Sequence, residues 1–163
     1  MKRLVIGFAL VTSIVTPSFA SEWALSSVNV SNDFALLINT DSLERNGDYV
    51  SFWSASVNTV KKLPFDAELV YVDVDCKQKR YMYKDYSFYL KGKELESGAY
   101  PSKWERPRPD TIVYAQIDMA CSRFDLSTAR KYQFANPKEL AKGAQRLLRD
   151  FQKEEIKKKG KPF

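Results

Sequence analysis

The sequence predicts an α+β fold. We expect an antiparallel β-sheet of about five or six strands, a disulfide-tethered helix on one face, and an additional C-terminal amphipathic helix. From residue 23 to about residue 89, short alternating runs of apolar and polar residues are separated by turn-forming clusters, which is typical of strands. After residue 110, apolar residues recur at helical spacing in two segments. One cysteine falls in each part, so a bridge between them would join a helix to the sheet.

The first twenty residues have the pattern of a secretory signal peptide. Lys2 and Arg3 form a basic head, residues 4–15 are almost wholly apolar, and Ser18-Phe19-Ala20 supplies small residues at the cleavage-critical positions. The apolar run is shorter than the roughly 20 residues that span a bilayer. We therefore expect cleavage after Ala20 and an exported protein, in the periplasm, at the outer cell surface or secreted, with no transmembrane segment after cleavage.

The mature chain, residues 21–163, has the length of a single domain and is mildly basic. The formal net charge of +6 falls to +4 when Lys2 and Arg3 are removed. The sequence has no histidine, which removes the commonest general base and the commonest metal-binding imidazole. It also lacks a Gly-x-Ser-x-Gly motif and a glycine-rich phosphate loop. We expect no catalytic residues, no metal site and no cofactor, and hence a protein that is not an enzyme.

The β region begins with two short strands and a hairpin. Residues 22–29 and 34–39 read as strands separated by a turn-forming cluster. Asn46-Gly47 lies between strand-like flanks and predicts a type I′ turn. The strand that follows, residues 49–58, carries large apolar side chains on both faces, which is typical of a central strand covered on both sides. The cover would be a helix or a partner chain, and the second alternative leaves a homodimer open.

The next two strands are predicted as an antiparallel pair. Residues 65–76 alternate, with valines and Cys76 on one face and Asp73 and Asp75 on the other. With no third ligand, we interpret these two carboxylates as a solvated or ion-paired face. Residues 80–89 form the neighbouring strand after a tight connection. Residues 91–110 are rich in Gly, Pro, Ser and charge, so we expect a long loop there.

Two helices are predicted after this loop. In residues 111–124, Val113, Ile117, Cys121 and Phe124 share one helical face, and Asp110 or Thr111 is available as the N-cap. An even number of cysteines in an exported chain indicates a disulfide, and a catalytic thiol would lack an activating histidine. We therefore expect Cys76–Cys121 to pin this helix onto the sheet.

The second helix is signalled by Asn136-Pro137-Lys138-Glu139, which combines an N-cap, proline at the first helical position and glutamate at the third. An apolar stripe follows, and the opposite face is basic; the stripe consists of Leu140, Ala144, Leu147, Leu148 and Phe151. We divide the chain into a signal peptide (1–20), an α+β domain (21–126), and a basic amphipathic helix and tail (127–163).

Several short motifs follow one another in order. They are Trp23, Asp41-Ser42-Leu43, Arg45-Asn46-Gly47-Asp48, Val50-x-x-Trp53, Val74-Asp75-Cys76, a Tyr-rich strand, Trp104 in a loop, and a proline-led helix ending at Cys121. Their order and spacing resemble the surface-adhesin protein E family of exported bacterial proteins. The resemblance implies an antiparallel sheet with a helix tethered through Cys76–Cys121. It also implies, for the best-known type of member, adhesion to host extracellular-matrix or plasma proteins.

Two groups of residues are candidates for a binding surface. The first interleaves bases and aromatic rings: Arg80, Tyr81, Tyr83, Lys84 and Tyr86. Export argues against nucleic acid as its partner, and the tyrosines either pack on the sheet face or offer a protein-binding surface. The second is the basic end, which is a solvated tail or a weak contact for a polyanion: Lys153, Lys157, Lys158, Lys159 and Lys161.

The sequence therefore predicts an exported, non-enzymatic binding protein that contacts a host matrix or plasma protein. The alternative is a periplasmic envelope protein, such as an inhibitor of a lytic enzyme or an assembly factor. The chain lacks the lipid-attachment cysteine that some surface members carry, and this favours the alternative. The resemblance favours the first function.

Overall fold

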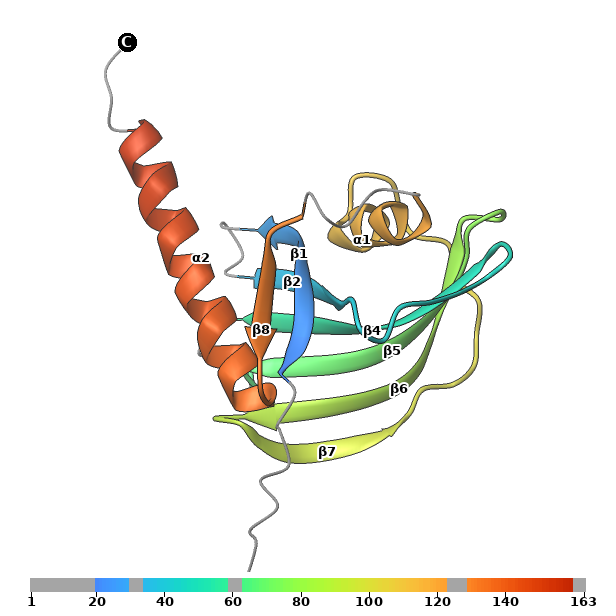
Figure 1. The fold of residues 1–163 in the computed structure, drawn as a ribbon, viewed down its shortest axis with the longest axis horizontal. Helices are drawn as coiled ribbons and strands as arrows, with labels where there is room; N and C mark the ends of the chain where they lie inside the picture. Colours follow the sequence, from blue (N-terminus) through green and yellow to red (C-terminus); the bar gives the residue numbers. More distant parts are fainter. Residues whose placement is uncertain (1–19, 30–33, 59–62, 123–128, 160–163) are drawn as a thin grey trace, which may run out of the picture.

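A computed structural model describes residues 20–29, 34–58, 63–122 and 129–159. The predicted signal peptide up to residue 19, Phe124 and Lys161 lie outside the described residues. An antiparallel eight-stranded sheet has the order β7-β6-β5-β4-β2-β1-β8, with β3 paired to β4 (Figure 1). The elements are β1 (Ser21–Asn29), β2 (Phe34–Asn39), β3 (Glu44–Asn46), β4 (Tyr49–Asn58), β5 (Ala67–Asp75), β6 (Arg80–Leu90), β7 (Lys93–Ala99), α1 (Ile112–Cys121), β8 (Lys131–Phe134) and α2 (Pro137–Lys159).

The two helices cover opposite faces of the sheet, each over its own apolar cluster. We call the face beneath α1 the α1 face; its buried side chains include Ile38, Phe52 and Val72. The opposite face, which we call the α2 face, includes Leu37 and Val57. Strand β4 contributes to both clusters because successive side chains of a strand point to opposite sides. Its predicted cover on both sides is thus provided by helices of the same chain, and this pattern gives no separate reason to invoke a second copy.

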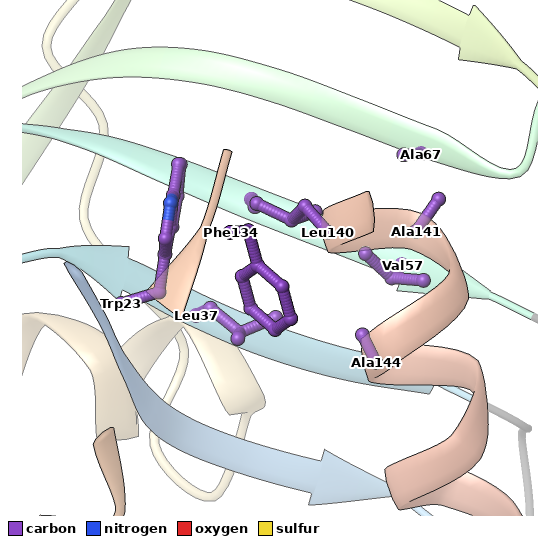
Figure 2. Close-up of a cluster of buried hydrophobic side chains, with 9 residues drawn as sticks. Trp23, Leu37, Val57, Ala67, Phe134, Leu140, Ala141 and Ala144 are labelled. Carbon is purple, nitrogen blue, oxygen red and sulfur yellow. The ribbon is translucent and has the colours of Figure 1, made fainter. Parts of the chain in front are cut away.

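Helix α2 begins and packs as its sequence predicts. The Asn136 Oδ1 accepts from the Glu139 amide at 3.0 Å, and the Glu139 carboxylate accepts from the Ala135 amide at 3.1 Å. The apolar stripe then meets the α2 face, where Leu140 and Ala144 lie beside Trp23, Leu37, Val57 and Phe134 (Figure 2). Leu140 and Leu148 are fully buried, and each contributes roughly 1.5–3 kcal/mol of burial free energy.

Helix α1 is held at its C-terminal end by a covalent and a polar link. Its N-cap is Thr111, whose hydroxyl accepts from the Tyr114 amide. Cys121, its last residue, forms the predicted disulfide with Cys76, which directly follows β5, at a Cα–Cα distance of 5.4 Å. The Arg45 guanidinium donates to the Ala120 and Ser122 carbonyls. The helix has no basic residue in its last turn, so Arg45 supplies the cation that its C-terminal carbonyls favour.

The structure corrects two details of the sequence interpretation. The hairpin between β3 and β4 turns at Gly47-Asp48, and only Gly47 of these two has a positive φ, which is the pattern of a type II′ rather than a type I′ turn. The sheet has eight strands instead of five or six because the predicted long loop contains β7, and because the short strands β3 and β8 add to it. Every residue of β7 is exposed, so neither face of this edge strand needs apolar residues. Its sequence therefore lacks the alternation of apolar and polar residues by which a strand is predicted.

Candidate functional site

The tyrosines of β6 lie together on the α1 face. A register shift between Val70 and Val72 leaves one extra residue in β6, because Val70 pairs with Tyr86 whereas Val72 pairs with Tyr83. This bulge brings Tyr86 to the same side as Tyr81 and Tyr83, although regular alternation would place it on the opposite face, three positions after Tyr83. All three rings are partly buried and pack against the α1-face cluster.

The basic residues of the predicted interleaved surface are separated from these tyrosines. Arg80 forms an ion pair with the buried Asp75 at 3.0 Å, and its guanidinium lies 4.7 Å from the centre of the Trp104 ring. Lys84 forms an ion pair with Asp73 at 3.5 Å. Because side chains alternate along β6, Arg80 and Lys84 lie on the same face as the carboxylates of β5, and the tyrosine rings lie on the α1 face. The carboxylate-bearing face is therefore ion-paired, which is one of the two alternatives predicted for it.

Tyr100 completes the aromatic array. Its ring centroid lies 4.7 Å from that of Tyr86 and 5.8 Å from that of Tyr83. Tyr81 meets Tyr83 edge to face at 5.0 Å. We call these four residues the tyrosine array. Tyr100 follows β7, and its amide donates to the Lys84 carbonyl, so it lies beside β6 in a segment that the sequence analysis treated as loop.

Three hydroxyls of the array are directed onto carboxylates. The Tyr81 hydroxyl donates to Glu105 at 3.3 Å and that of Tyr86 to Glu96 at 2.9 Å. The Tyr100 hydroxyl donates to Oε1 of Glu68 at 3.0 Å. The rings are thereby fixed in orientation, and the carboxylates give this side of the sheet a negative rim.

Two adjacent hollows flank Tyr83, which lines both of them. The smaller, of about 210 Å³, is lined by three tyrosines of the array and by other residues of the segment that follows β7: Tyr81, Tyr83, Tyr100, Pro101, Lys103 and Glu105. The other, of about 220 Å³, lies between α1 and the sheet, and we call it the α1 hollow. Its helix wall is formed by Ile112, Val113 and Gln116, and its sheet wall includes Leu36, Ser54, Ser56, Glu68 and Val70. Tyr83 is common to the two hollows, and we call the hollows and the array together the tyrosine groove.

Burial controls the ionisation of these groups. It raises the pKa of the Tyr83 hydroxyl well above its ordinary value, and the neighbouring Tyr81 and Glu68 add to the shift. Burial and the Glu68 carboxylate together raise the pKa of Tyr100 to about 12. Burial also raises the pKa of the Glu68 carboxyl, against the effect of the Tyr100 hydrogen bond. At physiological pH the tyrosines therefore present neutral rings and hydroxyl donors, and they cannot act as bases.

The basic C-terminal residues lie elsewhere. Figure 1 shows the C-terminal half of α2 extending past the sheet, away from β6. The Lys153 side chain is 73% exposed and forms an ion pair with Asp150, one turn earlier, at 3.7 Å. Lys157 is exposed, while Lys158 and Lys159 belong to the last turn of the helix. Of the described residues, Lys153 and Lys157 thus belong to a part of the molecule separate from the tyrosine array.

Sequence reasoning missed Glu68 and Tyr100. Glu68 lies two residues before Val70 in β5, so strand alternation puts it on the same face as Val70 and Val72. A carboxylate on this predicted apolar face could have marked Glu68 as a candidate site residue. Tyr100 had no such signal, because its position depends on the pairing of β6 with β7. Among the described residues, no three His, Cys, Asp or Glu side chains are grouped to hold a metal ion. In the same part of the chain, no helix is both long and apolar enough to cross a membrane.

Comparison with known proteins confirms the resemblance read from the motifs. The family model described as surface-adhesin protein E matches residues 23–122, which is more than half of the 163 residues. No curated protein and no solved structure matches the chain. The matched range contains both cysteines, α1 and the tyrosine groove, whereas β8 and α2 follow it. The chain therefore belongs to the surface-adhesin protein E family.

Proposed function

We propose that this protein is an exported, non-enzymatic binding protein that holds a segment of a host matrix or plasma protein in the tyrosine groove. The observation that carries the proposal is the array of Tyr81, Tyr83, Tyr86 and Tyr100 beside the hollow under α1. Tyrosine offers a large contact area at low conformational-entropy cost, which is why it is frequent in protein-binding surfaces. Membership in a family of surface adhesins supports a protein as the partner.

The groove is also built to be rigid, which supports binding rather than turnover. Its floor is a set of paired strands, its rings are oriented by hydrogen bonds to carboxylates, and its helix wall is tethered by Cys76–Cys121. A preorganised surface loses little freedom when the partner binds, so more of the contact energy appears as affinity. The raised pKa values of Tyr83 and Tyr100 favour a contact role for these hydroxyls over acid–base chemistry.

The exposed end of α2 supports a second, weaker contact with polyanions as part of the same proposal. Lys153 and Lys157 are exposed and belong to the C-terminal half of α2, which extends past the sheet (Figure 1), and the apolar stripe ends at Phe151. Exposed lysines act over about 8 Å at physiological salt, so this contact would be easily screened. Truncation after Asp150 should lower the salt concentration needed to elute the protein from heparin, and unchanged elution would remove the tail from the proposal.

Retention of matrix and plasma proteins tests the main proposal. The mature protein, residues 21–163, is immobilised and exposed to solubilised basement-membrane matrix or to plasma. Tyr83→Ala should reduce retention about tenfold or more, because truncating an aromatic hot-spot residue at the centre of an interface costs about 2 kcal/mol or more. The matched control is Tyr49→Ala, which removes a tyrosine that is 49% exposed at the β3–β4 hairpin, outside the groove.

Parent-like retention by Tyr83→Ala, with an unchanged circular dichroism spectrum, would contradict the proposal. Protease added to intact cells then separates the two locations. Loss of the protein while a periplasmic marker survives supports display at the surface. Protection until the outer membrane is opened would instead favour an envelope partner, as for an inhibitor of a lytic enzyme or an assembly factor.

A further inference from the structure

Glu68 is an unusual residue for the place that it occupies. Among the described residues that line the α1 hollow, it is the only one with a charged side chain; the others are apolar, aromatic, hydroxyl or amide groups. It lies on β5 opposite Ser56, on the face that elsewhere in this strand carries Val70 and Val72. An apolar side chain there would extend the core, so the carboxylate needs another explanation.

The protein compensates this carboxylate only in part. The Tyr100 hydroxyl donates to Oε1, and none of the ion pairs formed among the described residues includes Glu68. Burial raises its pKa, which means that the surroundings disfavour the charged form. Placing a charge where it is poorly solvated and unpaired costs folding free energy. A bound cation would remove this cost, whereas a bound anion would add to it.

The surfaces around Glu68 also suit a cation on an apolar stem. Tyr83 lines the hollow, and a tyrosine ring attracts an ammonium or guanidinium group through its π-electrons. Leu36, Val70 and Val113 supply apolar walls along which the methylene groups of a long side chain can lie. The adjacent hollow is less suitable, because Lys103 is among its lining residues.

The size of the hollow indicates one side chain rather than a larger ligand. Its volume is about 220 Å³, below the roughly 300–1,000 Å³ of pockets that enclose drug-sized molecules. A lysine or arginine side chain matches both the apolar walls and the carboxylate of the hollow. It has a long apolar stem and a terminal cation with several hydrogen-bond donors.

We propose that the α1 hollow receives a lysine or arginine side chain of the partner, with its cationic group at Glu68 and its stem against Val70 and Val113. This inference rests on the proposed function, because it defines the chemistry of the segment that the tyrosine groove holds. The partner segment is thus basic and extended, and its cationic residue is the anchor. The tyrosine array contacts the residues on either side of that anchor.

The probe is a blocked hexapeptide of alternating serine and lysine, which presents its lysines on one face when extended. The same peptide with norleucine in place of lysine keeps the stem and removes the charge. The lysine peptide should bind the parent and shift the NMR methyl resonances of Val70 and Val113, and the norleucine peptide should bind more weakly. Equal binding of the two peptides, or shifts confined to other methyl groups, would overturn the inference.

Glu68→Gln keeps the size of the side chain and an acceptor for the Tyr100 hydroxyl. It should weaken binding of the lysine peptide about tenfold or more, because the ammonium group loses a hydrogen bond to a charged acceptor. The matched control is Glu94→Gln, which removes a carboxylate that accepts the Tyr89 hydroxyl at 3.2 Å, outside the groove. This control should bind like the parent, and parent-like binding by Glu68→Gln would refute the role of the carboxylate.

The same variants separate this inference from the proposed function. Loss of matrix or plasma retention in both Tyr83→Ala and Glu68→Gln supports both. Loss in Tyr83→Ala alone, with peptide binding unaffected by Glu68→Gln, keeps the groove as the binding site and rejects the cation. Full retention by Tyr83→Ala rejects the proposed function, whatever the peptides show.

Discussion

Replacing Cys76 and Cys121 together by alanine removes the covalent link between the end of β5 and the last residue of α1. The bridge spans 45 residues in sequence, and closing a loop of that length removes chain entropy worth about 4 kcal/mol from the unfolded state. With a typical urea slope of about 2 kcal/mol per molar, the unfolding midpoint should fall by about 2 M. The measurement is urea unfolding of the mature domain, followed by tryptophan fluorescence without reductant.

Added reductant provides the internal control. It should lower the parent midpoint toward that of the double variant and leave the double variant unchanged. The native fold should survive in both, because Ile117 and Ala120 are buried against the sheet and Arg45 still binds the C-terminal carbonyls of α1. Coincident unfolding curves for the parent and the variant under oxidising conditions would refute this account of the tether.

Two further predictions concern α2 and the groove. Gly143→Ala should lower the melting temperature, although alanine favours a helix by about 1 kcal/mol, because its Cβ would lie 2.3 Å from a carbon of the Phe134 ring; a higher melting temperature would show that the ring moves aside. Tyr100→Phe should destabilise the domain at neutral pH, and this deficit should shrink between pH 10 and pH 12. The hydroxyl pKa is raised to about 12 in the folded protein from an ordinary value of 10.0, so its stabilisation is complete below pH 10 and declines above it. Urea midpoints at several alkaline pH values test this, and a deficit independent of pH would contradict it.

The sequence predicted those parts of the fold that depend on local patterns. The alternation in β4 and β5 and the capping box at Asn136 are each set by residues close together in the chain, and the structure confirms them. Strand β7 escaped prediction because both of its faces are exposed, so its identity as a strand depends on pairing with β6. The hairpin turn was placed correctly near Gly47 but assigned the wrong type, because Asn-Gly and Gly-Asp overlap there and only the backbone angles separate them.

The candidate site was predicted in part for the same reason. Tyr81 and Tyr83 share a face because they alternate within one strand, and this can be read directly from the sequence. Tyr86 joins them through a bulge, and Tyr100 and Glu68 join them through pairing between distant strands. These are long-range effects that a local pattern does not encode. Strand alternation also places Arg80 and Lys84 on the opposite face of the sheet from the tyrosine rings. These basic residues are therefore neighbours of the tyrosines in the sequence but do not share one surface with them.

The position of the hollow along α1 connects the disulfide to binding. The hollow is lined by the N-terminal half of the helix, through Ile112, Val113 and Gln116, whereas the disulfide holds the C-terminal residue, Cys121. Gln116 is buried, and its amide donates to the Ser54 hydroxyl at 2.8 Å, which fixes the helix to the sheet from within the hollow. The wall is therefore anchored at its C-terminal end, by the disulfide and Arg45, and within the hollow, by Gln116. In the function proposed above, the width of the groove would consequently be set before a partner binds, and binding need not supply the free energy to order it.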